Sequence, residues 1–171
     1  MSAFETAIDV GAPAIEFDVR MTADGQAVVL HDPSVDRTTD GSGEVRSMNL
    51  SEVRALRIPA DGADSEAVPT LEEVLRLASG RVAVDVEIKN IPGEPDFDAE
   101  HEHAVEAFHR ALDDVAFVGP VIVSSFNPMS IAASKALRPE VATGLLTEYS
   151  VDAEAGLTFA SAQGHDWVLP F

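Results

Sequence analysis

Short apolar segments rich in β-branched residues alternate along this chain with segments of helical period, and this alternation is the feature that most restricts its fold. The apolar segments predict strands at 14–20, 81–89, 120–126, 141–146 and 166–171. Strands that alternate with helices form a parallel sheet or a (β/α) barrel. A doubly wound sheet is the weaker alternative, because no glycine-rich phosphate loop follows the first strand.

The segments between these strands carry the signals of helices and of one hairpin. Thr70 and Glu73 have the spacing of a capping box at the start of a helix over 70–79. The pair Asp24-Gly25 predicts a tight turn that joins the first strand to the apolar run "AVVL". Further helices are predicted at 2–10, 50–56, 99–113, 128–137 and 155–164.

The chain length bears on how much of a barrel can form. A (β/α)₈ barrel typically takes about 250 residues, or roughly 31 per unit, so this chain has room for about five or six units. The 171 residues begin within a predicted helix and end on a predicted strand. We therefore expect residues 1–171 to form a single, partial barrel domain.

The amino-acid composition argues against several classes of protein. Thirty acidic residues against eleven basic ones give a formal net charge of −19. Contacts to nucleic-acid phosphates need clustered Lys and Arg, so we expect no nucleic-acid partner. The absence of cysteine excludes disulfides and thiolate zinc sites. No apolar run approaches the ~20 residues of a membrane span. No signal peptide is recognisable, and a cytoplasmic location is expected.

The first strand has an unusual pattern of charge. Side chains alternate between the two faces of a strand. In "AIEFDV", Ile15 and Phe17 therefore share one face, while Glu16 and Asp18 project together from the other. Adjacent carboxylates repel each other, and burying either is costly unless it is paired or bound to a metal. Either this face is solvated, or a cation binds there.

A second strand repeats the pattern. In "VEIKN", Glu87 and Lys89 share one face. Functional side chains of a barrel gather at the C-terminal ends of its strands, which would bring Glu16, Asp18 and Glu87 to one rim. Carboxylates with no softer ligand suit a hard divalent cation, Mg²⁺ or Ca²⁺. Lys89 would add a positive charge for an anionic substrate. His31, after the hairpin, would add a group that exchanges protons near neutral pH.

Taken together, these motifs resemble those of one family. The stretch "GAPAIEFDVRMTADGQAVVLHDPSVDRTTDGSGEV" resembles the signature region of glycerophosphodiester phosphodiesterases. The motifs "VPTLEEVL", "VEIKN", "VIVSSFNP" and "GLL" follow in the family's order and spacing, so the resemblance covers nearly the whole chain. It implies an α/β fold, the (β/α)₈ TIM barrel, incomplete in this chain. Strands two to six of eight would be present, with a hairpin and a small insertion after strand two.

The resemblance also implies an activity and a set of site residues. Members of the family use a divalent metal ion to cleave glycerophosphodiesters, such as deacylated phospholipids, to glycerol 3-phosphate and an alcohol. At the matching positions, Glu16, Asp18 and Glu87 are similar to the metal ligands. Lys89 is similar to a phosphate contact, and His31 to one of two acid–base histidines. The metal and Lys89 would stabilise charge on the phosphoryl oxygens in the transition state.

The chain departs from the family's pattern at both ends. The family's first strand ends in His-Arg-Gly and is followed by Pro-Glu-Asn, and neither tripeptide occurs here. The last two strands are also lacking, and Trp167 belongs to the sixth. We expect the chain alone to be inactive or weakly active, because loss of one of two acid–base groups costs about 10²–10⁴-fold. An unclosed barrel exposes sheet edges, so self-association is a further expectation.

Other interpretations stay open. The chain can be a non-catalytic relic that binds a divalent cation or a phosphodiester, or that scaffolds a partner. His31 can be a strand-end histidine satisfied by Asp32. His101 and His103 are two positions apart in a predicted helix, where they would point to different faces, which disfavours a metal site there. Ser124 has no base nearby in the sequence and is expected to be a rim residue.

Overall fold

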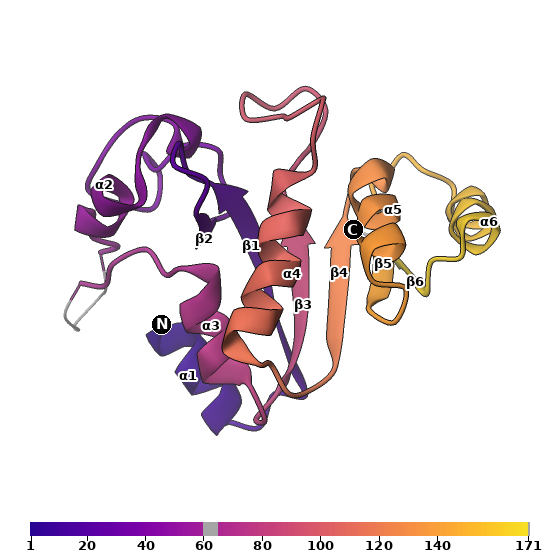
Figure 1. Ribbon diagram of the computed structural model, residues 1–171, viewed down its shortest axis with the longest axis horizontal. Coiled ribbons are helices and arrows are strands. Elements are labelled where there is room, and N and C mark those ends of the chain that lie inside the picture. The colour runs from indigo at the N-terminus through magenta and orange to yellow at the C-terminus, as the bar shows by residue number, and fades with distance from the viewer. Residues whose placement is uncertain (60–64, 171) are drawn as a thin grey trace.

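The structure is a computed structural model that describes residues 1–59 and 65–170. Its strands are β1 (Ala14–Met21), β2 (Ala27–Val29), β3 (Ala83–Ile88), β4 (Val121–Ser125), β5 (Ala142–Thr147) and β6 (Trp167–Pro170). They form a six-stranded sheet in the order β2-β1-β3-β4-β5-β6 (Figure 1). β1 pairs antiparallel with β2, and the other neighbouring pairs are parallel.

Helices connect the strands of the described part of the chain. They are α1 (Ser2–Asp9), the 3₁₀ helix η1 (Val45–Ser47), α2 (Leu50–Ala55), α3 (Leu71–Ala78), α4 (His103–Val115), α5 (Pro128–Leu137) and α6 (Ala153–Gln163). The predicted capping box begins α3. The backbone N–H of Glu73 donates to the Thr70 hydroxyl, and the backbone N–H of Thr70 donates to the Glu73 carboxylate. This exchange satisfies two donors that the first turn of a helix leaves without partners.

The main hydrophobic core lies between the sheet and the helices that cover one of its faces. Ile15 and Phe17 of β1 are buried there, as the alternation predicted. Leu75 of α3 and Phe108 of α4 belong to the same cluster. Figure 1 shows α3 and α4 lying along this side of the sheet. The even-numbered side chains of β1 therefore project from the opposite face.

A second, smaller hydrophobic cluster lies under the hairpin and the segment that follows it. Its buried members are Val28, Leu30, Val35, Val45, Val53 and Val68. The cluster packs the largely polar segment 33–48 against β2 and α2. The chain immediately after the hairpin, which carries His31, is thereby held in a defined position.

The predicted α/β class is confirmed, because helices alternate with the strands of a mostly parallel sheet. Within the described residues, β2 and β6 form the two edges of this sheet, and the sheet is not closed into a barrel. Each predicted strand is present, with boundaries that differ by at most two residues within the described part of the chain; residue 171, the predicted end of the last strand, lies outside the described residues.

One helix begins later than its prediction. The helix expected over 99–113 starts at His103. The Asp98 carboxylate accepts hydrogen bonds from the backbone N–H groups of Glu100 and His101, which holds the chain in a turn before the helix. The prediction that His101 and His103 point to different faces of one helix is therefore wrong. Their rings stack, with centroids 4.9 Å apart.

Candidate active site

Acidic side chains meet where two neighbouring parallel strands pair. In the register of β1 and β3, Asp18 lies opposite Glu87, and Glu16 lies opposite Asp85. Side chains opposite each other in a parallel pair project from the same face of the sheet. One carboxylate oxygen from each of Glu16, Asp18 and Glu87 lies within 4.8 Å of the others. The structure brings these three groups together, and their role as ligands stays a prediction.

Lys89 lies among these carboxylates. The residue is 7 % exposed, and its Nζ is 2.6 Å from Oε1 of Glu87 and 3.0 Å from Oδ1 of Asp18. Burial lowers the pKa of Lys89, but Glu87 and Asp18 outweigh this effect and raise the pKa above its ordinary value. Lys89 is therefore charged at neutral pH, and two carboxylates compensate for its burial.

One lysine does not balance the negative charge of this group. Burial, and then repulsion by Asp18 and Glu87, raises the pKa of Glu16 to about 7. Glu16 keeps contact with solvent, yet the walls of the cavity around it reduce its hydration. Burial also raises the pKa of Glu87, against the lowering effect of Lys89. Burial is the main cause of both raised pKa values and repulsion by neighbouring carboxylates adds to it, so a bound cation would stabilise the ionised forms.

The donor set fits a hard divalent cation. Three carboxylates supply the oxygens, and oxygen ligands are those that Mg²⁺ and Ca²⁺ prefer. When Glu16, Asp18 and Glu87 are ionised and Lys89 is protonated, three negative charges and one positive charge leave a net charge of −2. A divalent cation neutralises that charge without any softer ligand.

His31 lines the same cavity and is oriented by a neighbouring carboxylate. Its Nδ1 lies 2.7 Å from Oδ1 of Asp32. Arg37 donates hydrogen bonds of 2.6 and 2.9 Å to the two oxygens of Asp32. Arg37 first, and then His31, holds the pKa of Asp32 far below its usual range. Because Nδ1 is engaged, Nε2 is the ring nitrogen available to exchange a proton with a ligand.

The predicted site residues line one cavity of about 590 Å³. The predicted residues Glu16, Asp18, His31, Glu87 and Lys89 line it from β1, β3 and the end of the hairpin, and three further carboxylates belong to the lining: Asp85, Glu94 and Glu148. Apolar and aromatic side chains come from the ends of β4 and β5: Phe126, Leu146 and Tyr149. The cavity therefore offers charge for an anionic group beside a surface suited to a less polar substituent.

A buried arginine joins two of the loops around this cavity. Arg20 of β1 is 2 % exposed, and its Nε donates a 2.7 Å hydrogen bond to the carbonyl oxygen of His31. Its guanidinium also pairs with Asp96 at 2.7 Å and with Glu94 at 2.8 Å. Arg20 thus ties the chain at His31 to the loop that follows β3.

Sequence reasoning missed some residues of the cavity. Asp85 also lines it and has the same two-residue spacing as Glu87 and Lys89, so the alternation contained a signal for it. Ser124, the expected rim residue, lines the cavity and donates a 2.7 Å hydrogen bond to Asp85. Glu94 reaches the cavity from the loop after β3, and its spacing in the sequence gives no indication of this.

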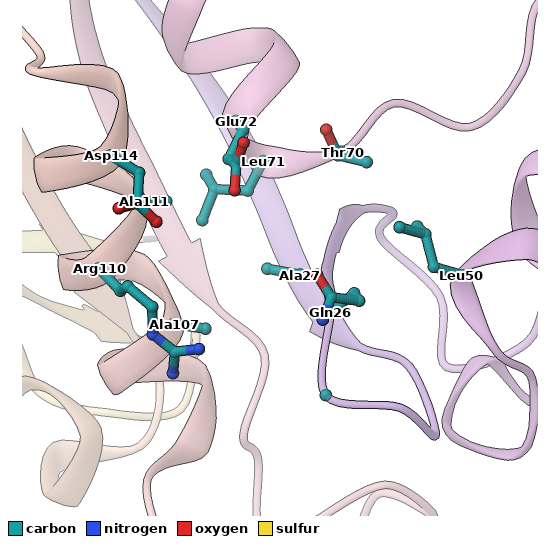
Figure 2. Close-up of a pocket in the computed structure, with 11 residues that line it drawn as sticks. Gln26, Ala27, Leu50, Thr70, Leu71, Glu72, Ala107, Arg110, Ala111 and Asp114 are labelled. Carbon is teal, nitrogen blue, oxygen red and sulfur yellow. The ribbon is translucent and has the colours of Figure 1, made fainter.

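A smaller pocket of about 190 Å³ lies between the hairpin, α3 and α4. Figure 2 shows Arg110 and Asp114 of α4 on one side of it and Gln26 and Ala27 of the hairpin on another. Neither group of metal-ligating side chains found among the described residues belongs to this pocket. The larger cavity is therefore the candidate active site.

Comparison with known sequences identifies relatives of the whole described fold. A family model described as "Glycerophosphoryl diester phosphodiesterase family" matches residues 1–169. A glycerophosphodiester phosphodiesterase of Caldanaerobacter subterraneus subsp. tengcongensis is 36% identical over 154 residues, which are 85% of this chain and 59% of that protein. One from Bacillus altitudinis is 33% identical over 153 residues, 86% of this chain and 60% of that protein. The chain thus spans less than two thirds of the length of these curated relatives.

Solved structures share the fold. A phosphodiesterase of Oleispira antarctica, in complex with the product sn-glycerol-3-phosphate, superposes with a TM-score of 0.82 at 24% identity, covering 99% of this chain and 67% of that one. A glycerophosphodiester phosphodiesterase of Thermotoga maritima gives 0.74 at 23% identity, covering 99% and 65%. The related structures are TIM barrels, so the open sheet corresponds to part of a barrel. No helix in the described residues has the length and apolar character needed to cross a membrane.

Proposed function

This chain belongs to the glycerophosphoryl diester phosphodiesterase family, and on that basis we propose that its cavity hydrolyses glycerophosphodiesters to glycerol 3-phosphate and an alcohol. The observation that carries the proposal is the meeting of an acidic cluster, a buried lysine and an oriented histidine in one cavity of about 590 Å³. Phosphodiester hydrolysis needs these kinds of group: a cation site, a phosphate contact and a proton-transfer group.

Glu16, Asp18 and Glu87 are the residues that hold the divalent cation in this proposal. A bound Mg²⁺ or Ca²⁺ stabilises the charge that gathers on phosphoryl oxygens during displacement. The three carboxylates support this assignment because their oxygens lie within 4.8 Å of one another. The raised pKa of Glu16 supports the assignment as well, because burial and the neighbouring carboxylates both disfavour the ionised form, which a bound cation would stabilise.

Lys89 is the proposed contact for the substrate phosphate. Its Nζ is engaged with Glu87 and Asp18, at 2.6 and 3.0 Å. Once the charge of these two carboxylates is compensated by a divalent cation, the ammonium group of Lys89 is free to interact with a phosphate oxygen. Because Lys89 is buried, its charge acts with little screening by solvent.

His31 is the proposed proton-transfer group. Hydrolysis joins a water oxygen to phosphorus and breaks the bond to the leaving alcohol, so one proton leaves the water and one joins the alkoxide. Asp32 fixes the ring through Nδ1, which leaves Nε2 to carry a proton to or from the reacting oxygens. Among the described residues that line the cavity, His31 is the only histidine. We therefore propose low activity for this chain alone, about 10²–10⁴-fold below that of a site with both acid–base groups.

The test is an assay of glycerol 3-phosphate release from a mixture of deacylated phospholipids, with Mg²⁺, with Ca²⁺ and with a chelator. The proposal expects slow release that requires a divalent cation and is lost in Glu87→Gln and in His31→Gln. Glu72→Gln, an exposed change on α3, serves as the control and keeps the parent's rate. Cation binding without any release of glycerol 3-phosphate contradicts the proposal and favours a non-catalytic binding protein.

A further inference from the structure

A group of metal-ligating side chains lies outside the candidate active site, where α4 begins. Asp98, His101 and His103 each offer one ligand atom, and these atoms all lie within 4.8 Å of one another. We propose that these three residues form a second metal site, which binds a divalent transition ion such as Zn²⁺. Its three ligands are distinct from the carboxylates of the candidate active site, Glu16, Asp18 and Glu87.

The two imidazole rings approach the same carboxylate. Nδ1 of His103 is 2.8 Å from Oδ2 of Asp98, and Nδ1 of His101 is 3.8 Å from Oδ1. The ring planes lie within 10° of parallel, and the Nδ1 atom of each ring is the one that lies within 4 Å of an Asp98 oxygen. An ion bound at Nδ1 takes the place of the proton that a neutral ring donates there, and the ring then keeps its proton on Nε2. Both side chains are more than half exposed, so an ion can reach the two rings from solvent and the displaced protons can leave.

Asp98 is held in place by the backbone around it. Its Oδ1 accepts hydrogen bonds of 3.1 and 3.0 Å from the N–H groups of Glu100 and His101. The buried Asn90 accepts a 2.8 Å hydrogen bond from the Asp98 N–H and donates one of 3.1 Å to the Asp98 carbonyl oxygen. Partners of this kind orient ligands and raise metal affinity.

The residue between the two histidines is fixed as well. Oε2 of Glu102 accepts hydrogen bonds from the Asn90 side chain at 3.1 Å and from the Ser130 hydroxyl at 2.8 Å. Ser130 lies in the first turn of α5 and is fully buried. The segment that carries the histidines is therefore anchored to a second helix. Tetrahedral Zn²⁺ holds its ligands at about 2.0–2.2 Å. In this proposal the two exposed rings rotate on binding, so that the three donors, now within 4.8 Å of one another, move onto one ion.

The charge around the group attracts a cation. Residues 94–103 contain five carboxylates and no Lys or Arg, and Arg20 pairs with two of the five, Glu94 and Asp96. Asp98 and His103 also line a pocket of about 110 Å³, which leaves room for water ligands. Arg46, which lines that pocket, is paired with Glu44 at 2.9 Å, and the other basic side chains of the lining, Arg20 and Lys89, are paired with carboxylates as well. A surface of one sign raises the local concentration of the opposite charge.

The ligand types separate this site from the acidic cluster of the cavity. Two imidazoles and one carboxylate suit Zn²⁺ and its neighbours in the transition series, whereas three carboxylates suit Mg²⁺ or Ca²⁺. Three protein ligands leave a fourth tetrahedral position for water. The loop that joins Lys89 to this site also lines the cavity through Ile91 and Glu94. A bound ion would therefore fix the far end of a loop that borders the candidate active site.

The test titrates Zn²⁺ into the full chain, freed of metal with a chelator, in competition with a chromophoric chelator. We expect one equivalent to bind with a dissociation constant in about the micromolar range. In His101→Gln/His103→Gln, affinity falls by about 100-fold or more, since even supporting partners are worth about 10–100-fold. Zinc binding survives in Glu16→Gln/Asp18→Asn and in the matched control His31→Gln, which also removes an exposed histidine paired with a carboxylate.

Two outcomes overturn the proposal. The first is zinc affinity that is unchanged in the double histidine variant. The second is zinc affinity lost in Glu16→Gln/Asp18→Asn, which would place the ion in the acidic cluster. If the double variant fails to fold, nuclear magnetic resonance of the parent's imidazole nitrogens shows which histidines bind zinc. The proposal expects zinc to shift the ring signals of His101 and His103, and shifts confined to other histidines contradict it.

Discussion

Asp18 and Glu87 face each other because the apolar period of β1 and β3 fixes how these two strands pair. A slip of one residue would turn the odd-numbered apolar side chains of β1 to the cavity and the carboxylates into the core. Burying an uncompensated carboxylate costs far more than any gain from the slipped pairing. At the scale of single residues, one two-residue period therefore specifies both the core and the acidic cluster.

This placement predicts how the carboxylates share a cation. Asp18→Asn removes a charged oxygen from the group and should weaken Mg²⁺ binding by about 10–100-fold, at least the effect of losing a supporting partner. Isothermal titration calorimetry measures the change. The matched control is Asp85→Asn, which makes the same substitution on a carboxylate that accepts a hydrogen bond from Ser124. Equal losses in both variants would mean that general charge attracts the ion, without specific ligation by Asp18.

Arg20 predicts a stability effect at the residue scale. Arg20→Met leaves Asp96, whose side chain is 7 % exposed, without its partner. Removing one member of a buried ion pair costs about 3–5 kcal/mol. Urea unfolding measures this loss, and the control is Arg37→Met, whose exposed pair with Asp32 is worth about 1 kcal/mol or less. Equal losses in the two variants would contradict a structural role for Arg20 in joining the loops.

The sequence revealed the acidic cluster more readily than the contacts that organise it. Glu16 and Asp18 stand out because charged residues interrupt an apolar strand at a regular period. Arg20 follows the same period, but its partner Asp96 lies 76 positions away, and no local pattern connects the two. Contacts of this kind depend on how the loop after β3 folds back, which only the three-dimensional structure shows.

At the scale of elements, the strands were predictable because short segments rich in apolar and β-branched residues, alternating with charged residues in β1 and β3, are typical of strands. The start of α4 was not predictable, because Glu100, His101 and Glu102 are residue types that a helix accepts. The Asp98 carboxylate accepts hydrogen bonds from the backbone N–H groups of the next turn. Short acidic side chains can form such bonds in place of helical ones, and this delays the start of the helix. That difference moves His101 out of the helix and beside His103.

The packing of α4 against α5 predicts a dependence of stability on pH. Nε2 of His109 lies 2.9 Å from the Ser134 hydroxyl, and Nδ1 has no hydrogen-bond partner among the described residues. Burial, and then the charge of Arg138, lowers the pKa of His109 to about 4. The unfolded chain binds this proton near pH 6.5, so between these values the unfolded state holds more protons than the folded state. Stability is therefore complete above pH 6.5 and falls as the pH drops toward 4.

Comparison with His109→Gln measures this contribution. A pKa difference of about 2.5 corresponds to at most about 3 kcal/mol of unfolding free energy. Urea unfolding at pH 7.5 and at pH 5 should show a larger loss in the parent than in His109→Gln, because glutamine keeps a side-chain amide near Ser134 and does not titrate. Equal losses in parent and variant would show that His109 is hydrated or charged in the folded state.

At the scale of the whole molecule, net charge and exposed apolar surface act in opposite directions. The formal charge of −19 makes each copy repel another at low ionic strength. Several large apolar side chains are nevertheless exposed near the edge strand β6: Tyr149, Val151, Leu157, Phe159 and Trp167. An edge strand also presents unpaired backbone groups that can pair with another chain. Salt weakens the repulsion without weakening apolar association, so it decides which effect prevails.

We therefore predict self-association through the β6 edge that increases with salt. Sedimentation velocity should show mainly monomer near 20 mM NaCl and a larger species near 500 mM. Between these concentrations the Debye length falls from roughly 20–30 Å to below about 8 Å, so the repulsion between copies is screened. Trp167, the single tryptophan, should shift its emission to shorter wavelength as it leaves water. Trp167→Lys suppresses the larger species, whereas Val118→Lys, at another exposed apolar residue, does not. A chain that stays monomeric at both salt concentrations, or two variants that behave alike, would show that β6 is not the contact.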